Sequence, residues 1–238
     1  MIATAAFSPL RRVSAGTLTG LAVLAAAATG IATPAAAAPG APLPAFTDGE
    51  PGLPSLLLDG PEATDLLGAQ LETNRTYYSL ANNDTVRPSQ CVGAYLAGQS
   101  DAYAGADTID VAVRRLSGKS TLVTEAVVQL ASKREALAQV EAIADSWKEC
   151  GGMTMSERSS EDGSLQQWKL GSPVLNDDKT IVTLSQTLVG GRATCERAAA
   201  AYRDVVIDVL SCSGSRSASG MASDVVKAIA DKASQPAI

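Results

Sequence analysis

The residues of this chain best suited to chemistry are its four cysteines, which occur in a sequence without histidine. They are Cys91, Cys150, Cys195 and Cys212. No two of them form a C-x-x-C pair, and a zinc site would need all four distant thiolates, so redox and metal chemistry are disfavoured. An even number of cysteines in an exported protein is typical of structural disulfides, and we expect two disulfides here.

Four cysteines can pair in three ways, and their spacing alone does not choose between them. Cys195 and Cys212 lie on consecutive predicted strands with a turn near residues 202–204, so they can face each other across a hairpin. Cys91 and Cys150 would then join a short helix to the end of a long one. On the loop-entropy model, either bridge would stabilise the fold by about 3 to 4 kcal/mol.

The absence of histidine excludes the Ser-His-Asp and Cys-His mechanisms and every histidine-ligated metal. The sequence also lacks G-x-S-x-G, a serine three residues before a lysine, a P-loop and G-x-G-x-x-G. The remaining catalytic candidates are acidic pairs, namely Asp107 with Asp110, Glu161 with Asp162, and Asp177 with Asp178. We interpret them as solvated turn residues, because aspartate favours turn geometry. We therefore expect no catalytic residue, cofactor or metal, with a two-carboxylate hydrolase as a minor alternative.

A few aromatic and cationic residues could line a binding cleft. Trp147 falls on the apolar face of a predicted helix, so we expect it in the core. Trp168 lies in a short predicted strand, where it can face either the core or the wall of a cleft. The other conceivable cleft residues, which an exposed strand face explains equally well, are Tyr103, Arg114 and Arg115.

The elements that would position these residues are helices and strands in alternating groups. Helices are predicted over residues 56–70, 88–97, 132–150 and 219–233. Strands are predicted over residues 109–115, 121–130, 153–157, 165–170, 180–189, 193–200 and 205–210. Turn signals occur at residues 82–84, 117–119, 162–163 and 190–191. The pattern predicts an α+β fold: a single domain with a twisted antiparallel β-sheet, packed helices and two disulfides.

The helix over residues 132–150 is the best-defined element. Ser132 followed by Glu135 is the capping-box pattern, and two glycines end the helix after Cys150. The residues expected on its buried face are Leu137, Val140, Ile143, Ala144 and Trp147. The residues expected to face inward from the first and last helices are Leu66, Leu67, Met221, Val225, Val226 and Ile229.

Residues 1–38 have the pattern of a secretory signal peptide. Arg11 and Arg12 precede an uncharged stretch over residues 13–31, and the alanines at 35–38 offer cleavage positions. A membrane anchor is the alternative, but the stretch is weakly hydrophobic and broken by glycines. No cysteine follows it for lipid attachment, so we expect a secreted protein with no membrane span after cleavage.

Residues 39–54 are rich in proline and glycine and are expected to form a linker, followed by one folded domain over residues 55–238. The net charge of the whole chain is −6. This acidic balance argues against nucleic acid as a partner, because nucleic-acid binding depends on Lys and Arg at the phosphates. It equally argues against a polybasic attachment to anionic lipid.

The order of several residues along the chain carries a family resemblance. In sequence order they are Cys91, Tyr103-Ala104-Gly105, Val127-Val128, the Ser132-capped helix with Trp147 and Cys150, Trp168, Cys195, the strand 205–209 and Cys212. This order resembles the PknH-type extracellular sensor domain of mycobacteria and their relatives, over residues 56–233. In that family the domain occurs both on receptor Ser/Thr kinases and in standalone exported proteins.

The resemblance implies a sandwich-like α+β fold in which the first cysteine pairs with the second and the third with the fourth. It also implies a groove for an unidentified ligand and no catalysis, but it carries over no ligand-binding residues. We therefore expect a secreted, non-enzymatic module that binds a small molecule or cell-envelope component. The alternatives are a module that docks on an envelope protein and, less favoured, a carboxylate-dependent hydrolase.

Overall fold

The computed structural model describes residues 52–158, 163–176 and 180–235. The chain divides into two units, Met1–Ala41 and Pro42–Ile238, and the fold below is that of the second. The predicted signal peptide and nearly all of the predicted linker lie outside the described residues. Among the residues that are described, no helix is both long and apolar enough to cross a membrane.

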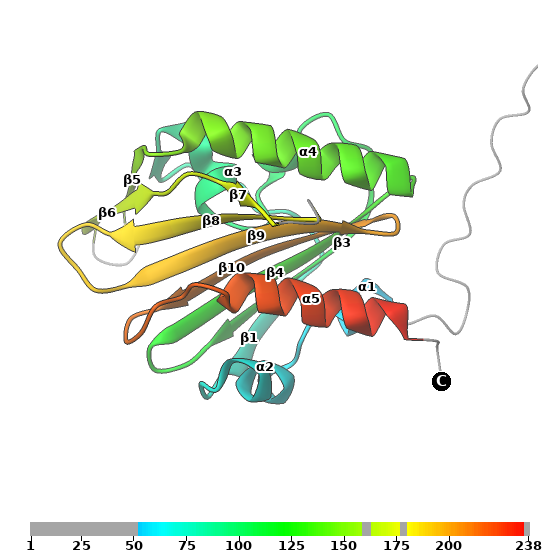
Figure 1. Ribbon diagram of the computed structural model, residues 1–238, viewed down its shortest axis with the longest axis horizontal. Helices are drawn as coiled ribbons and strands as arrows, with labels where there is room; N and C mark the ends of the chain where they lie inside the picture. Colours follow the sequence, from blue (N-terminus) through cyan, green and yellow to red (C-terminus); the bar gives the residue numbers. More distant parts are fainter. Residues whose placement is uncertain (1–51, 159–162, 177–179, 236–238) are drawn as a thin grey trace, which may run out of the picture. The chain divides into compact units, whose positions relative to one another are not determined.

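The described elements are helices packed on one large sheet (Figure 1). The helices are α1 (Leu53–Leu56), α2 (Gly60–Leu67), α3 (Val92–Tyr95), α4 (Lys133–Cys150) and α5 (Met221–Ser234), with the 3-10 turns η1 (Ser89–Cys91) and η2 (Ser100–Tyr103). The strands are β1 (Glu72–Tyr77), β2 (Val86–Arg87), β3 (Thr108–Ser117), β4 (Thr121–Leu130), β5 (Thr154–Arg158), β6 (Leu165–Leu170), β7 (Val174–Leu175), β8 (Ile181–Leu188), β9 (Thr194–Tyr202) and β10 (Val205–Ser213).

The ten strands form one antiparallel sheet in the order β1-β3-β4-β10-β9-β8-β6-β5-β2, with β7 also paired to β8. Successive side chains of a strand point to opposite faces, so the central strands supply two cores. Ala126 and Val206 belong to the core under α4, whereas Val127 and Ile207 belong to the core under α1, α2 and α5. Figure 1 shows α4 and α5 on opposite sides of the sheet. This arrangement confirms the predicted fold class.

Helix α4 begins as predicted, because Ser132 Oγ accepts a hydrogen bond from the backbone N–H of Glu135 (3.2 Å). The predicted burial of Leu137 is wrong, since its side chain is 48% exposed. The buried stripe of α4 begins at Ala136, which lies one turn before Val140 and takes the place expected for Leu137. Leu66 in α2 is likewise 41% exposed, and Leu67 alone makes the inward contact of that pair.

Strand β1 was not predicted from the sequence. Its six residues, Glu72–Tyr77, are polar, and the strand lies at one edge of the sheet, paired only with β3. An edge strand with both faces largely exposed has no apolar alternation to reveal it. The short strands β2 and β7, of two residues each, also carry too little pattern to be recognised.

Both disulfides form with the pairing that the resemblance implies. Cys91 bonds to Cys150, which ties η1 to the end of α4. Cys195 bonds to Cys212, and these two residues are direct partners in the β9–β10 ladder. The predicted turns at residues 117–119 and 190–191 connect β3 to β4 and β8 to β9, while Asp162 of the third hairpin signal lies outside the described residues.

Candidate ligand-binding cavity

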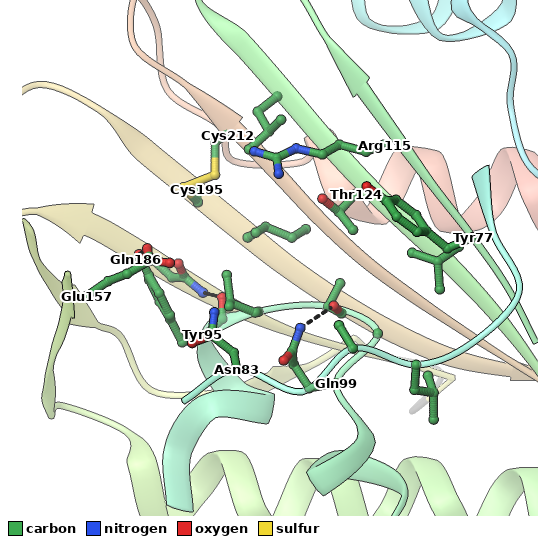
Figure 2. A pocket seen from close by; sticks show the side chains of 18 of the residues that line it. Tyr77, Asn83, Tyr95, Gln99, Arg115, Thr124, Glu157, Gln186, Cys195 and Cys212 are labelled. Carbon is green, nitrogen blue, oxygen red and sulfur yellow. Dashed lines mark hydrogen bonds between the residues drawn. A yellow bond between two sulfur atoms is a disulfide. The ribbon is translucent and has the colours of Figure 1, made fainter. Parts of the chain in front are cut away.

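A cavity of about 560 Å³ lies on the face of the sheet that also carries α4 (Figure 2). The cavity has two walls. Strands β3, β4, β5, β6, β8, β9 and β10 form the first wall, and the segments over residues 77–83 and 95–99 form the second. The lining residues from β3 to β10 are Val113, Arg115, Leu122, Thr124, Glu157, Gln166, Trp168, Gln186, Cys195, Leu210 and Cys212. The cavity therefore exists because the chain after β1 and after α3 crosses over one face of the sheet.

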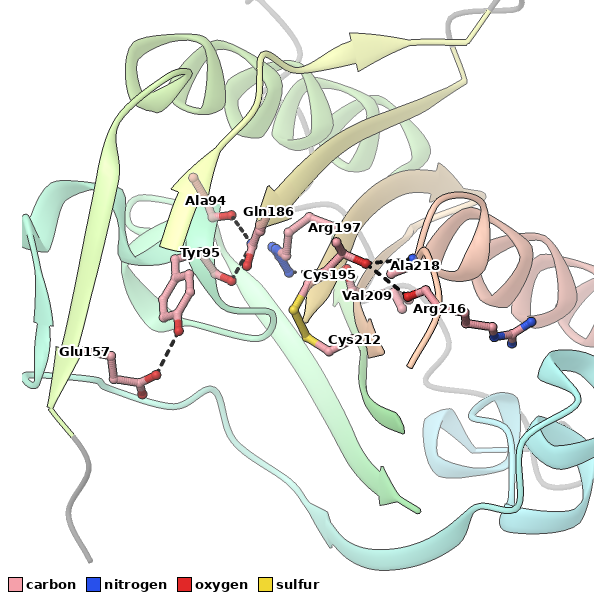
Figure 3. Close-up of a disulfide and its surroundings, with 11 residues drawn as sticks. Ala94, Tyr95, Glu157, Gln186, Cys195, Arg197, Val209, Cys212, Arg216 and Ala218 are labelled. Atoms are coloured by element: carbon pink, nitrogen blue, oxygen red, sulfur yellow. Dashed lines mark hydrogen bonds between the residues drawn. A yellow bond between two sulfur atoms is a disulfide. The ribbon is translucent and has the colours of Figure 1, made fainter. Parts of the chain in front are cut away.

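Gln186, on β8, attaches the second wall to the sheet. Its side chain is almost fully buried, and Nε2 donates to the backbone oxygens of Ala94 (3.2 Å) and Tyr95 (2.8 Å) (Figure 3). Both carbonyls belong to α3, which leads directly into segment 95–99. A side chain that lines the cavity thus also fixes its opposite wall.

A buried ion pair attaches the same wall at a second place. Arg197 Nη2, on β9, lies 2.7 Å from Asp208 Oδ1, on β10. Arg197 Nη2 also donates to the backbone oxygen of Gly93 (3.0 Å), and Asp208 Oδ2 accepts from the backbone N–H of Gly98 (2.9 Å). Gly98 has a φ of +65°, a conformation that glycine adopts without strain. The pair therefore holds Gly93 and Gly98, which lie at the two ends of the segment that closes the cavity.

Helix α4 completes this support through Trp147. The Arg197 guanidinium lies 5.0 Å from the centre of the Trp147 ring, within the range of a cation–π interaction. The indole Nε1 of Trp147 donates to the backbone oxygen of Gly93 (3.3 Å). Trp147 is 1% exposed, which confirms its predicted place in the core.

At one end of the cavity, the Tyr95 hydroxyl donates a hydrogen bond to Glu157 Oε2 (2.9 Å). Burial raises the pKa of the Tyr95 hydroxyl well above its ordinary value, and the charge of Glu157 raises it further. Tyr95 consequently stays a neutral donor, and Glu157 is the only acidic residue among the described lining residues. A two-carboxylate hydrolytic site is not built in the described cavity.

The cleft residues suggested by the sequence divide into two groups. Trp168 and Arg115 line the cavity. Arg114 instead points to the opposite face, where it donates to backbone oxygens of the segment around α1. Tyr103 is buried against Asp208, with its hydroxyl 3.5 Å from Oδ2, and burial raises the pKa of that hydroxyl well above its ordinary value.

The acidic pairs suggested by the sequence form no site that the structure describes. Asp110 lies in β3, at an irregularity in its pairing with β4, so the turn expected there is wrong for this residue. Its Oδ1 accepts from the N–H of Val111 (2.8 Å). Glu161, Asp162, Asp177 and Asp178 lie outside the described residues. Within the described ranges no group of three acidic or cysteine residues is arranged to hold a metal.

Sequence reasoning missed Gln186, Gln99, Tyr95 and Glu157. Gln186 is the one polar residue on the side of β8 that faces the core under α4, where the other residues are Val182, Leu184 and Leu188. A polar residue in that position is the signal that could have identified it. Gln99 and Tyr95 offer no such signal, because Gln99 lies in a loop, Tyr95 ends the short helix α3, and only the tertiary fold brings both residues to the sheet.

The family model for the PknH-like extracellular domain matches residues 50–232 of the chain. The chain belongs to this family. Among solved structures, the extracellular domain of PknH from Mycobacterium tuberculosis superimposes with a TM-score of 0.67 at 25% sequence identity, covering 76% of this chain and 93% of that one.

Curated relatives from two species carry the name serine/threonine-protein kinase PknH. The protein of Mycobacterium bovis is 26% identical over 170 residues, which cover 68% of this chain and 28% of the relative. The protein of Mycobacterium tuberculosis is 26% identical over the same length, which covers 26% of the relative. This PknH-like domain therefore spans little more than a quarter of the kinases that it matches.

Proposed function

We propose that this PknH-like domain is a secreted, non-catalytic module that binds a small molecule or a cell-envelope component in the cavity described above. The observation that carries the proposal is the cavity itself. Its volume of about 560 Å³ lies in the range of small-molecule sites, and it combines apolar walls with a few polar groups. The extracellular family favours a ligand found outside the cell.

The rigidity of the walls supports binding over a merely incidental gap. The Cys91–Cys150 disulfide, Gln186 and the Arg197–Asp208 pair each join the covering segments to the sheet or to α4. A site whose walls are fixed before the ligand arrives loses less conformational entropy on binding. The composition of the lining disfavours a carboxylate-dependent hydrolase, since the described lining residues include one carboxylate and the sequence has no histidine.

The test is native mass spectrometry of the protein purified from the culture filtrate of its own host. We expect a reproducible extra mass that is lost on denaturation. A Thr124→Trp variant, which fills the cavity from β4, should lose this mass. The matched control is Thr187→Trp, an exposed position on the other face of β8. Equal retention of the mass by both variants would place the ligand elsewhere and contradict the proposal.

An envelope protein is the second candidate partner, and one surface feature favours it. Tyr77 and Tyr78 are 41% and 70% exposed, at the end of the edge strand β1. Exposed tyrosines beside an unpaired strand edge are common in protein interfaces. A Tyr78→Ser variant that loses a co-purifying protein while keeping any small-molecule mass would support this alternative.

A further inference from the structure

Three side chains that line the cavity each carry a buried polar atom without a hydrogen-bond partner in the described part of the chain. They are Oε1 of Gln186, Oε1 of Gln99 and Nε1 of Trp168. Exposed fractions of 1%, 5% and 8% show that bulk water hardly reaches these residues. An unpaired buried donor or acceptor is unfavourable by about 1–3 kcal/mol, so a ligand that pairs with it gains that free energy.

Gln186 and Trp168 are placed so that one ligand group could satisfy both. Trp168 pairs with Leu188 across the β6–β8 ladder, which makes Gln186 its diagonal neighbour on the same face. The Cα atoms of such diagonal neighbours lie roughly 7–8 Å apart, so both side chains rise from one small area of the sheet. A secondary amide has both groups that they need, because its N–H can donate to Gln186 Oε1 while its carbonyl oxygen accepts from Trp168 Nε1–H. The Oε1 of Gln99 offers a second acceptor from the opposite wall.

Arg115 supplies the only positive charge among the described lining residues. No ion pair within those residues neutralises it. Figure 2 shows its side chain extending from β3 toward the Cys195–Cys212 disulfide. A guanidinium at the wall of a partly apolar cavity favours an anionic ligand group with which it can form two parallel hydrogen bonds.

The surface between these two polar ends is mostly apolar, and Thr124 is the one polar side chain that β4, β9 and β10 contribute to the described lining. Leu122, Leu210 and the Cys195–Cys212 disulfide line the cavity from β4, β10 and β9. Arg115 stands on β3 and Gln186 on β8. These strands are four strand spacings apart in the sheet order, which is roughly 19 Å. The long Arg115 side chain covers part of this distance. The anionic group and the amide of a ligand must therefore be separated by several methylene-sized units.

We propose that the cavity selects an elongated monoanion that carries a secondary amide, with an apolar spacer between the amide and the anionic group. The amide pairs with Gln186 and Trp168, the spacer lies along the leucines and the disulfide, and the anion pairs with Arg115. This inference rests on the proposed binding function and specifies the chemical class of its ligand.

The probe is N-acetyl-6-aminohexanoate, titrated into ¹⁵N-labelled protein and followed by NMR. The chain has two tryptophans, so two indole N–H signals are expected, and a Trp168→Phe variant assigns them. The Trp168 signal should shift with saturation below about 1 mM. The Trp147 signal should stay in place, because its indole N–H is already bonded to Gly93.

Three analogues test the parts of the proposed ligand separately. N-hexylacetamide lacks the anion, 6-acetoxyhexanoate lacks the amide N–H, and N-acetylglycine lacks the spacer. Each should bind about tenfold more weakly or worse, since each leaves one polar atom or the apolar surface without a partner. Equal binding of all four compounds would overturn the assignment.

Arg115→Gln should weaken binding of the probe about tenfold while leaving that of N-hexylacetamide unchanged. The matched control is Arg192→Gln, which removes an exposed arginine in the turn between β8 and β9. If both variants weakened binding of the probe equally, Arg115 would not be the group that binds the anion, and that part of the proposal would be wrong.

The outcomes also separate this inference from the proposed function. If the probe has no effect but a fragment library of neutral and cationic compounds shifts cavity signals, the ligand class is wrong and the binding function stands. If neither the probe, the library nor the culture filtrate shifts any signal from residues that line the cavity, both proposals fail.

Discussion

Arg197 and Asp208 form an ion pair in which each side chain is 1% exposed. The two residues stand on neighbouring strands, β9 and β10, and both also bond to the chain that closes the cavity. Desolvation makes such a pair a weak source of net stability, but the loss of one partner leaves an uncompensated charge in the core. The relationship therefore couples the integrity of the sheet to the shape of the cavity.

Asp208→Ala should lower the free energy of unfolding by about 3–5 kcal/mol, because it leaves the Arg197 guanidinium buried without its carboxylate. The measurement is urea denaturation followed by tryptophan fluorescence. Asp145→Ala is the matched control: it breaks the exposed pair with Lys148, and we expect a change of less than about 1 kcal/mol. Similar losses in the two variants would show that burial does not govern the effect.

Removal of the Cys91–Cys150 bridge by a double serine substitution should cost about 4 kcal/mol, because its cysteines are 59 residues apart in sequence. The corresponding loss for Cys195 and Cys212, which are 17 residues apart, should be about 3 kcal/mol. Hydrogen exchange should also rise in residues 89–103 for the first double variant and not for the second. Labelling of the unreduced wild-type protein by a thiol reagent would contradict both bridges.

Stability should decrease as the pH rises from about 5 to 8, because of Glu125 on the α5 face of the sheet. Burial raises the pKa of this carboxyl to about 8, although the N–H of Leu58 and the charge of Arg114 act in the opposite direction. The folded state then holds a proton that the unfolded chain releases near pH 4.5, so the free energy of unfolding falls between those two values. Melting temperatures measured across this range should show the decline.

Glu125→Gln should flatten this pH dependence, since glutamine keeps the shape of the protonated acid without titrating. The control is Glu141→Gln, at an exposed position of α4, which should leave the slope unchanged. A slope that survives in Glu125→Gln would assign the pH dependence to other groups.

The contrast between α4 and β1 explains what the sequence could reveal of the fold. Helix α4 carries a cap, an apolar stripe and terminal glycines, three local signals that agree with one another. Strand β1 owes its existence to pairing with β3 and has no local signal of its own. The same limit applies to the cavity, because Gln99 and Trp168 are far apart in sequence and meet only through tertiary folding.

Arg114 and Arg115 provide a matched pair of adjacent arginines on opposite faces of β3. Arg114 donates to the backbone oxygens of Pro54, Leu57 and Leu58, each at 3.0 Å, and so holds the segment around α1 on the sheet. Arg114→Ala should therefore lower the free energy of unfolding by about 2–4 kcal/mol, since three partly buried carbonyls lose a charged donor. Limited proteolysis should cut this variant near residues 52–58 sooner than the wild type.

Arg115→Ala should leave the free energy of unfolding within about 0.5 kcal/mol of the wild type, because Arg115 is exposed and forms no ion pair within the described residues. It should instead weaken binding of an anionic probe in the cavity. The two variants thus separate stability from binding at neighbouring positions of one strand. If Arg115→Ala destabilised the fold as much as Arg114→Ala, the assignment of Arg115 to the cavity would lose its basis.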